Sequence, residues 1–323
     1  MRRLFFASVV LVALTLALLT GCTDRAVQPA QDKLVVITTL FPQYDFVREI
    51  AGDRVDVRLL LPPGMEPHAY EPSPRDIVDI RGADLLIFTA HVMEPWVTRI
   101  VSTVAGSSLR VVESGAGVTF LADDHYDEEH DDDDDDDDRD HGHSHGEADP
   151  HIWLDPLNAV IMVDNIAKAL SSADPDYAET YYARAEAYNI KLQQLHETIA
   201  AALAPLTNRT ILYAGHFSFG YFAHRYGLHH ISPYAGFAPD AEPTPQRIAE
   251  LIQRVSESGS NTIFYAELVD PRVARVISEQ TGAEMVLLHG IHNVSKDELN
   301  SGATYLELMK ANLDRLVEGL RIK

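Results

Sequence analysis

Four histidines follow segments that the sequence predicts to be strands, or lie in loops that lead to the ends of strands. They are His68, His151, His216 and His292. In open α/β sheets, ligands bind at the carboxyl ends of the strands. Neutral imidazole is a good ligand for zinc, which takes nitrogen ligands at about 2.0–2.1 Å in tetrahedral geometry. The pattern therefore indicates a metal site between two lobes, with two histidines from each lobe.

Spacing alone makes this no more than a hypothesis, because a single histidine after a strand is more often a structural residue than a ligand. The sequence contains no HExxH motif, no pair of histidines on one helical turn and no CxxC motif. A secreted zinc hydrolase is the alternative from another class, since catalytic zinc has three protein ligands, an open water position and a nearby base. Glu267 would then stand beside three of the histidines.

Two series of alternating strands and helices must position these residues. The first series has predicted strands at 33–40, 55–61, 84–90 and 107–114, and helices at 42–52, 73–83, 93–104 and 156–169. The second has predicted strands at 210–215, 228–232, 261–267 and 283–290, and helices at 217–227, 244–259, 270–282 and 302–322. Strands separated by helices predict parallel sheets. The fold class is therefore α/β, with two lobes.

The longest helical pattern lies between the two series, at residues 174–205. Asp174 is its expected cap, and Pro205 ends it. At 1.5 Å per residue it would be roughly 45 Å long, which suits a rigid helix joining two lobes. The predicted division is an N-terminal lobe at 33–173, this linker helix, and a C-terminal lobe at 206–323.

The N-terminus carries a targeting signal. Arg2 and Arg3 precede an apolar run of 17 residues, Leu4 to Thr20, which a Leu-Thr-Gly-Cys box closes at Cys22. This box is similar to the bacterial lipoprotein signal, which implies a signal peptide at 1–22, lipid on Cys22 and a tether at 23–32. A single membrane span, which needs roughly 20 apolar residues, is the alternative. The one cysteine of the chain excludes an intrachain disulfide and a cysteine-based zinc cluster.

Most of the formal charge of −23 is confined to one loop. Residues Asp123 to Asp149 hold 16 acidic side chains and one arginine, which is −15 of the total. Such a run cannot bury apolar surface, so residues 119–149 are predicted to be a disordered loop. Phosphates would be repelled, which argues against nucleic acid, whereas a cation fits. The loop histidines expected to bind metal weakly are His125, His130, His141, His143 and His145.

Four motifs occur in order with sensible gaps. They are "LLLPPGMEPHAYEPSPRDI" (59–77), "DPHIWLDPLNA" (149–159), "HFSFGYFAHRYGL" (216–228) and "TGAEMVLLHGIHNVSKDEL" (281–299). Together they resemble the substrate-binding lipoproteins of bacterial ABC transporters for zinc and manganese, over essentially the whole mature chain. The resemblance implies two Rossmann-like lobes joined by a rigid helix, with the metal between them. A loop rich in histidine and acid at this place is typical of the zinc branch.

The ligand positions of that family fall on His68, His151 and His216. The fourth is usually a carboxylate shortly before the last helix, and the alignment places His292 there, with Glu267 as the best substitute. His289, Asp297 and water are weaker choices. Imidazole favours zinc over manganese, which prefers oxygen ligands. The residues expected to orient the rings from behind are Asp155, Asp240 and Glu267.

The resemblance also implies the partners and the place of action. We expect an extracytoplasmic monomer, anchored to the cell membrane by lipid on Cys22, that delivers zinc to a cognate ABC permease and its ATPase. Adhesion to other cells is a role sometimes attributed to relatives. Binding is expected to weaken as the pH falls, because imidazoles must be neutral to bind metal.

Overall fold

The computed structural model describes residues 33–68, 70–103, 108–121, 148–234, 243–268 and 270–321. Contacts divide the chain into two units, Met1–Lys33 and Leu34–Lys323, and the sheets belong to the second unit. The predicted features that lie outside the described residues are the signal peptide with Cys22, the tether, Asp240 and the loop histidines His125, His130, His141, His143 and His145.

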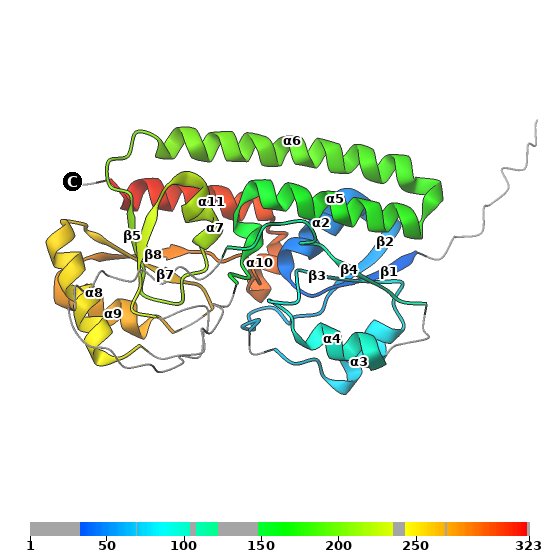
Figure 1. The fold of residues 1–323 in the computed structure, drawn as a ribbon, viewed down its shortest axis with the longest axis horizontal. Helices are drawn as coiled ribbons and strands as arrows, with labels where there is room; N and C mark the ends of the chain where they lie inside the picture. The colour runs from blue at the N-terminus through cyan, green and yellow to red at the C-terminus, as the bar shows by residue number, and fades with distance from the viewer. Residues whose placement is uncertain are drawn as a thin grey trace, which may run out of the picture. The chain divides into compact units, whose positions relative to one another are not determined.

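The N-terminal lobe is built around a sheet of four parallel strands in the order β2-β1-β3-β4. The strands are β1 (Leu34–Thr38), β2 (Val55–Leu59), β3 (Leu85–Phe88) and β4 (Arg110–Glu113). The helices are α2 (Phe41–Ala51), α3 (Pro74–Arg81), α4 (Trp96–Thr103) and α5 (Pro156–Ala173). Side chains alternate along β3, so Leu85 and Ile87 pack with α2 and α5, whereas Leu86 and Phe88 pack with α3 and α4. Figure 1 shows α2 and α5 on one side of this sheet and α3 and α4 on the other.

The C-terminal lobe contains two pairs of parallel strands. They are β5 (Thr210–Leu212) with β6 (His229–Ile231), and β7 (Thr262–Ala266) with β8 (Glu284–Leu288). A single bridge between Tyr213 and Phe264 joins the pairs. The helices are α7 (Gly220–Tyr226), α8 (Pro245–Ser258), α9 (Arg272–Thr281), α10 (Lys296–Ser301) and α11 (Tyr305–Gly319). One face of these strands packs on α8 and α9, and the other on α7 and α11.

Helix α6 (Ala178–Leu203) connects the two lobes. Its 26 residues span about 39 Å. It packs against α2 and α5 of the N-terminal lobe and against α11 of the C-terminal lobe, and Figure 1 shows it running beside α5 and α11. Its buried stripe, which includes Tyr188, Leu192 and Leu195, joins a core that is continuous across both lobes. Among the described residues, no helix has both the length and the apolar character needed to cross a membrane.

The helix starts show where local prediction succeeds and where it fails. Ser73 and Thr244 cap α3 and α8 through their side chains, as predicted. Asp174 does not cap α6, because the chain first forms a 3-10 turn, Pro175–Tyr177, and its carboxylate instead binds Arg54 and the Tyr181 hydroxyl. The predicted fold class, two α/β lobes with parallel sheets joined by a long helix, is confirmed, and the lobe boundaries stay a prediction.

Candidate metal centre

Three of the predicted histidines lie together. One side-chain nitrogen each from His68, His151 and His216 lies within 4.8 Å of the other two. Nε2 of His68 is 3.1 Å from Nε2 of His151, and the His216 ring centroid is 5.3 Å and 4.9 Å from the other two centroids. Two nitrogens bound tetrahedrally to zinc would be about 3.3–3.4 Å apart, given bond lengths of about 2.0–2.1 Å. The cluster therefore has close to the dimensions that a zinc ion requires.

The loop that carries His68 follows β2 and is held from the C-terminal lobe. The side-chain amide of Asn293, which is fully buried, donates hydrogen bonds to the carbonyls of Pro62 (2.7 Å) and Met65 (2.8 Å). This amide fixes the loop at two points, six and three residues before its histidine. The position of His68 therefore depends on a segment more than 200 residues further along the chain.

Asp149 holds His151, which lies just before the 3-10 helix Ile152–Leu154. Both residues are 1% exposed. Oδ1 of Asp149 lies 2.9 Å from the backbone nitrogen of His151 and 2.8 Å from its Nδ1. An ionised carboxylate can only accept, so Nδ1 is then the donor and Nε2 keeps the lone pair that a metal would use. Trp153 ties the same segment to the C-terminal lobe, because its indole nitrogen donates to the Gly290 carbonyl at 2.8 Å.

Burial sets the charge of these groups. It lowers the pKa of His151 to about 3 and lowers the pKa of His216 well below its usual range, with nearby His151 and His68 adding to the effect on His216. Burial raises the pKa of Asp149 to about 7, although the hydrogen bond from the His151 amide opposes that rise. Both rings are therefore neutral near pH 7, which is the state that binds a metal.

His292 and Glu267 lie next to the cluster without belonging to it. His292 Nε2 is 3.7 Å from Glu267 Oε1, and neither His292 Nδ1 nor Glu267 Oε1 has a hydrogen-bond partner within the described part of the chain. Burial lowers the pKa of His292 strongly, with contributions from the three clustered histidines, and raises the pKa of Glu267. Gly290 permits this arrangement, since a Cβ there would lie 2.8 Å from His292 Nδ1. The fourth ligand thus stays a prediction.

Backbone strain is concentrated beside these two residues. Leu268, directly after Glu267, has φ of 60°, and Ile291, directly before His292, has φ of 59°. Left-handed φ is a real outlier for a β-branched residue such as isoleucine. Residues held in such conformations cost about 1–3 kcal/mol each and cluster at functional sites. The strain supports a functional role for the segments that carry Glu267 and His292.

Two further sequence candidates have structural contacts instead. His289 Nδ1 accepts the backbone hydrogen of Ile291 at 2.9 Å, so that nitrogen has no lone pair left for a metal, whereas its Nε2 lies 3.5 Å from Glu298 Oε1 and keeps His289 a weaker candidate ligand. Asp155 was expected to orient a ring, but its carboxylate caps α5 by accepting from the Leu157 nitrogen and pairs with Arg225 at 2.7 Å. We therefore assign Asp155 to helix capping and to the contact with α7.

Two residues that contact the ligand segments were not predicted. Asp149 had a usable signal, a carboxylate two residues before His151, but it was counted with the acidic loop that it ends. No signal in the sequence pointed to Asn293, because the carbonyls that it binds, those of Pro62 and Met65, are remote in the sequence.

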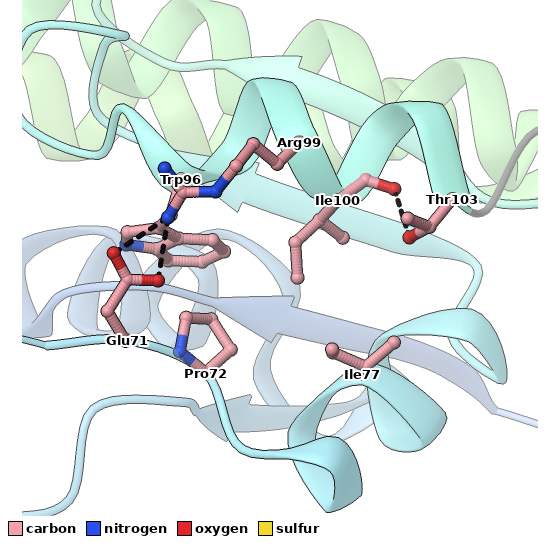
Figure 2. Close-up of a pocket in the computed structure, with 7 residues that line it drawn as sticks. All are labelled: Glu71, Pro72, Ile77, Trp96, Arg99, Ile100 and Thr103. Carbon is pink, nitrogen blue, oxygen red and sulfur yellow. Dashed lines mark hydrogen bonds and ion pairs between the residues drawn. The ribbon is translucent and has the colours of Figure 1, made fainter.

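A pocket on the N-terminal lobe lies beyond the His68 loop and does not include the histidines. Its lining residues are Glu71, Pro72, Ile77, Trp96, Arg99, Ile100 and Thr103. Figure 2 shows the Glu71 carboxylate facing the Arg99 guanidinium at the edge of this pocket, with both oxygens 2.7 Å from one nitrogen. Both side chains are largely exposed, so this pair fastens the loop only weakly.

Similar proteins agree in the metal that they are named for. The high-affinity zinc uptake system protein ZnuA of Bacillus subtilis (strain 168) is 36% identical over 292 residues, which cover 90% of this chain and 89% of the relative. The zinc-binding lipoprotein AdcA of Streptococcus pneumoniae (strain ATCC BAA-255 / R6) is 31% identical over 310 residues, 96% of this chain but 60% of the relative. This chain therefore spans little more than half the length of AdcA.

Solved structures show the same fold. The Zn(II)-bound ZnuA-like domain of Streptococcus pneumoniae AdcA aligns with a TM-score of 0.74 at 30% identity, over 90% of this chain and 99% of that domain. The laminin-binding protein Lmb of Streptococcus agalactiae, described as bifunctional with adhesin and metal transporting activity, aligns with a TM-score of 0.76 at 30% identity, over 90% and 100% of the chains. Residues 36–319 match the family described as zinc-uptake complex component A, periplasmic, and the chain belongs to that family.

Proposed function

We propose that this protein captures Zn²⁺ outside the cytoplasm and delivers it to a membrane permease and its ATPase. The observation that carries the proposal is the cluster of His68, His151 and His216, whose nitrogens lie within 4.8 Å of one another. The matched family, a periplasmic component of a zinc-uptake complex, supports it. Zinc is here the cargo, and it leaves when the permease accepts it.

The donor set favours zinc over manganese. Three imidazoles suit zinc, whereas manganese prefers carboxylate and water oxygens. Burial of His151 and His216 keeps both rings neutral, so zinc need not displace protons from them near pH 7. We infer that His292 completes the shell, with Glu267 as the alternative. Burial lowers the pKa of His292, and the three clustered histidines lie close enough for their charges to lower it further. Each of the two residues also has a buried side-chain atom without a hydrogen-bond partner among the described residues.

The finer parts of the proposal concern the ends and the loop of the chain. Lipid on Cys22 would hold the protein at the membrane as a monomer, and His125, His130, His141, His143 and His145 would bind zinc weakly and pass it to the ordered site. The lipobox and the composition of the acidic loop support these statements. Neighbouring carboxylates would raise the local concentration of cations, since opposite charges attract.

The zinc hydrolase alternative has less support. The relatives described above are named for zinc uptake, zinc binding or laminin binding. An open fourth position beside the three histidines, with Glu267 as base, is the geometry that a hydrolase would need. The fourth position of the zinc shell therefore distinguishes the two functions: a protein ligand there favours zinc transport, and an open position favours hydrolysis.

Metal stoichiometry and competitive zinc affinity of a protein lacking Asp123 to Glu147 test the proposal, alongside the same protein with His292→Ala or Glu267→Gln. We expect one tight zinc, lost with His151→Ala and sharply weakened by His292→Ala. Weakening by Glu267→Gln alone would move the fourth ligand to that carboxylate. A protein that binds no tight zinc, or that binds one indifferently to both substitutions and hydrolyses ester or amide substrates, would refute the proposal.

A further inference from the structure

Hydrogen bonds hold Asp149 in place next to His151, one of the clustered histidines. Its backbone nitrogen donates to the Leu121 carbonyl at 2.9 Å, and its own carbonyl accepts from the Tyr221 hydroxyl at 2.7 Å. Its side chain is 1% exposed, and Oδ1 contacts both nitrogens of His151 that face it, the backbone nitrogen and Nδ1. The carboxylate therefore has little freedom to move, and the ring of His151 is fixed through it.

The other oxygen of Asp149 lies against Gly220 of the C-terminal lobe. Oδ2 has no hydrogen-bond partner among the residues that the structure describes. A Cβ built on Gly220 would lie 2.1 Å from Oδ2 and 3.3 Å from Cγ, so no larger residue fits unless Asp149 moves. Gly220 does not have a positive φ, so the backbone conformation itself would accept alanine. The need for glycine at this position comes from the carboxylate alone.

Gly220 also links this contact to another clustered histidine. It is the first residue of α7 and follows His216 by four residues. The segment with His151 and the segment with His216 thus meet where the Asp149 carboxylate packs on Gly220. A change in this contact would alter the orientation of the His151 ring relative to His216 without replacing a ligand.

We propose that Asp149 and Gly220 together act as a positioning pair for metal binding, in which Asp149 fixes the tautomer and orientation of His151 and Gly220 provides the space for the carboxylate. This rests on the proposed function, because it assumes that His151 binds the metal. Groups that orient a metal-binding histidine through its second nitrogen are typically worth about 10- to 100-fold in metal affinity. The pair would then belong to the binding machinery although neither residue touches the ion.

The test compares three variants of the full mature chain, Asp149→Ala, Asp149→Asn and Gly220→Ala, with two matched controls. Asp155→Asn alters another buried aspartate of the same motif, whose carboxylate accepts from the Leu157 nitrogen at the start of α5 and pairs with Arg225. Gly319→Ala crowds a glycine in α11, where a Cβ would lie 2.5 Å from Phe264. The measurements are competitive zinc affinity, thermal unfolding of the zinc-free protein, and the His151 ring tautomer from long-range proton–nitrogen NMR spectra.

We expect Gly220→Ala and Asp149→Ala to weaken zinc binding by about 10- to 100-fold, whereas both controls lower the unfolding temperature and leave zinc affinity within about twofold of the wild type. His151 should carry its proton on Nδ1 in the wild type and in Asp149→Asn, whose amide oxygen still accepts, but not in Asp149→Ala. If Asp149→Ala fails to fold, the loss of zinc affinity in Gly220→Ala carries the test.

Two results would overturn the proposal that Asp149 and Gly220 position His151. One is wild-type zinc affinity in both Gly220→Ala and Asp149→Ala, or in Gly220→Ala alone if Asp149→Ala does not fold. The other is an affinity loss in Gly319→Ala as large as that in Gly220→Ala, which would reduce the effect to general destabilisation. Failure of the proposed function is distinguishable, because the wild-type protein itself would then bind no tight zinc.

Discussion

Replacing Asn293 with alanine should weaken zinc binding although its side chain lies behind the His68 loop. The substitution removes three hydrogen bonds, from Asn293 to the carbonyls of Pro62 and Met65 and from the Val294 nitrogen to the Asn293 oxygen. At about 0.5–1.5 kcal/mol each, their loss lowers the free energy of unfolding by about 1.5–4.5 kcal/mol. The two bonds to the His68 loop, worth about 1–3 kcal/mol, set the largest effect on zinc affinity at roughly 5- to 150-fold.

The assay is zinc titration against a competing chelator, with urea unfolding of the zinc-free protein measured in parallel. Asn165→Ala is the matched control, because the Asn165 amide also donates to two carbonyls of one loop, those of Ser114 and Ala116, at 2.9 Å each. That loop carries no candidate ligand, so this control should lose stability and keep its zinc affinity. Equal zinc affinity in Asn293→Ala and Asn165→Ala would refute the coupling between Asn293 and the position of His68.

Three further predictions concern protons, the surface ion pair and the contact with α7. Protons compete with zinc as the pH falls through the pKa of a ring, and burial moves that fall for His151 to about pH 3. Zinc affinity should therefore drop by no more than about tenfold between pH 7.5 and 5.5. Three exposed rings, each with a pKa of about 6.5, would together lose about a thousandfold over the same range. A thousandfold loss in the titration would contradict the inference that burial keeps the rings neutral. Arg99→Ala should change the unfolding free energy by less than about 1 kcal/mol and leave zinc affinity unchanged, because its ion pair is exposed; a larger shift in urea unfolding would show that the pair matters. Tyr221→Phe removes the hydroxyl that bridges the Leu121 nitrogen and the Asp149 carbonyl, so it should cost about 1–3 kcal/mol in urea unfolding, and an unchanged midpoint would contradict the bridge.

The periodicity of the sequence was sufficient to predict two α/β lobes, whereas the close approach of His68, His151 and His216 was implied by the family resemblance. The runs that became β1, β2, β5 and β8 are short and apolar, and glycine or proline follows or separates them. Parallel strands bring their carboxyl ends to one edge of a sheet, so His68 and His216, which follow β2 and β5, were each expected at such an edge, one in each lobe. Periodicity cannot predict how the two lobes pack against each other. His151 was expected to bind metal because the motif around it resembles that of the family.

The contacts that hold the ligands depended on pairs of residues far apart in the sequence. Asn293 binds carbonyls at Pro62 and Met65, and Asp149 packs on Gly220, contacts for which neither composition nor periodicity gives a signal. The prediction that Asp174 caps the long helix was wrong for a related reason. A carboxylate before a proline has the local signature of a cap, but tertiary pairing with Arg54 gives it a charged partner that the helix end cannot match.

Hydrogen bonds join the segments that carry the candidate ligands across the two lobes, and this limits how zinc can leave. Gly64, in the loop before His68, donates to the Val294 carbonyl at 2.9 Å, and Trp153 donates to the carbonyl of Gly290. Moving the His68 loop away from the 290–294 segment therefore breaks the Gly64 bond and the two Asn293 bonds together. A wide hinge opening would need all of them to break, and also the hydrogen bond from the Phe41 nitrogen to the His292 carbonyl at 3.1 Å. The arrangement thus disfavours exit of the ion through a wide separation of the two lobes, because that movement would break these hydrogen bonds together.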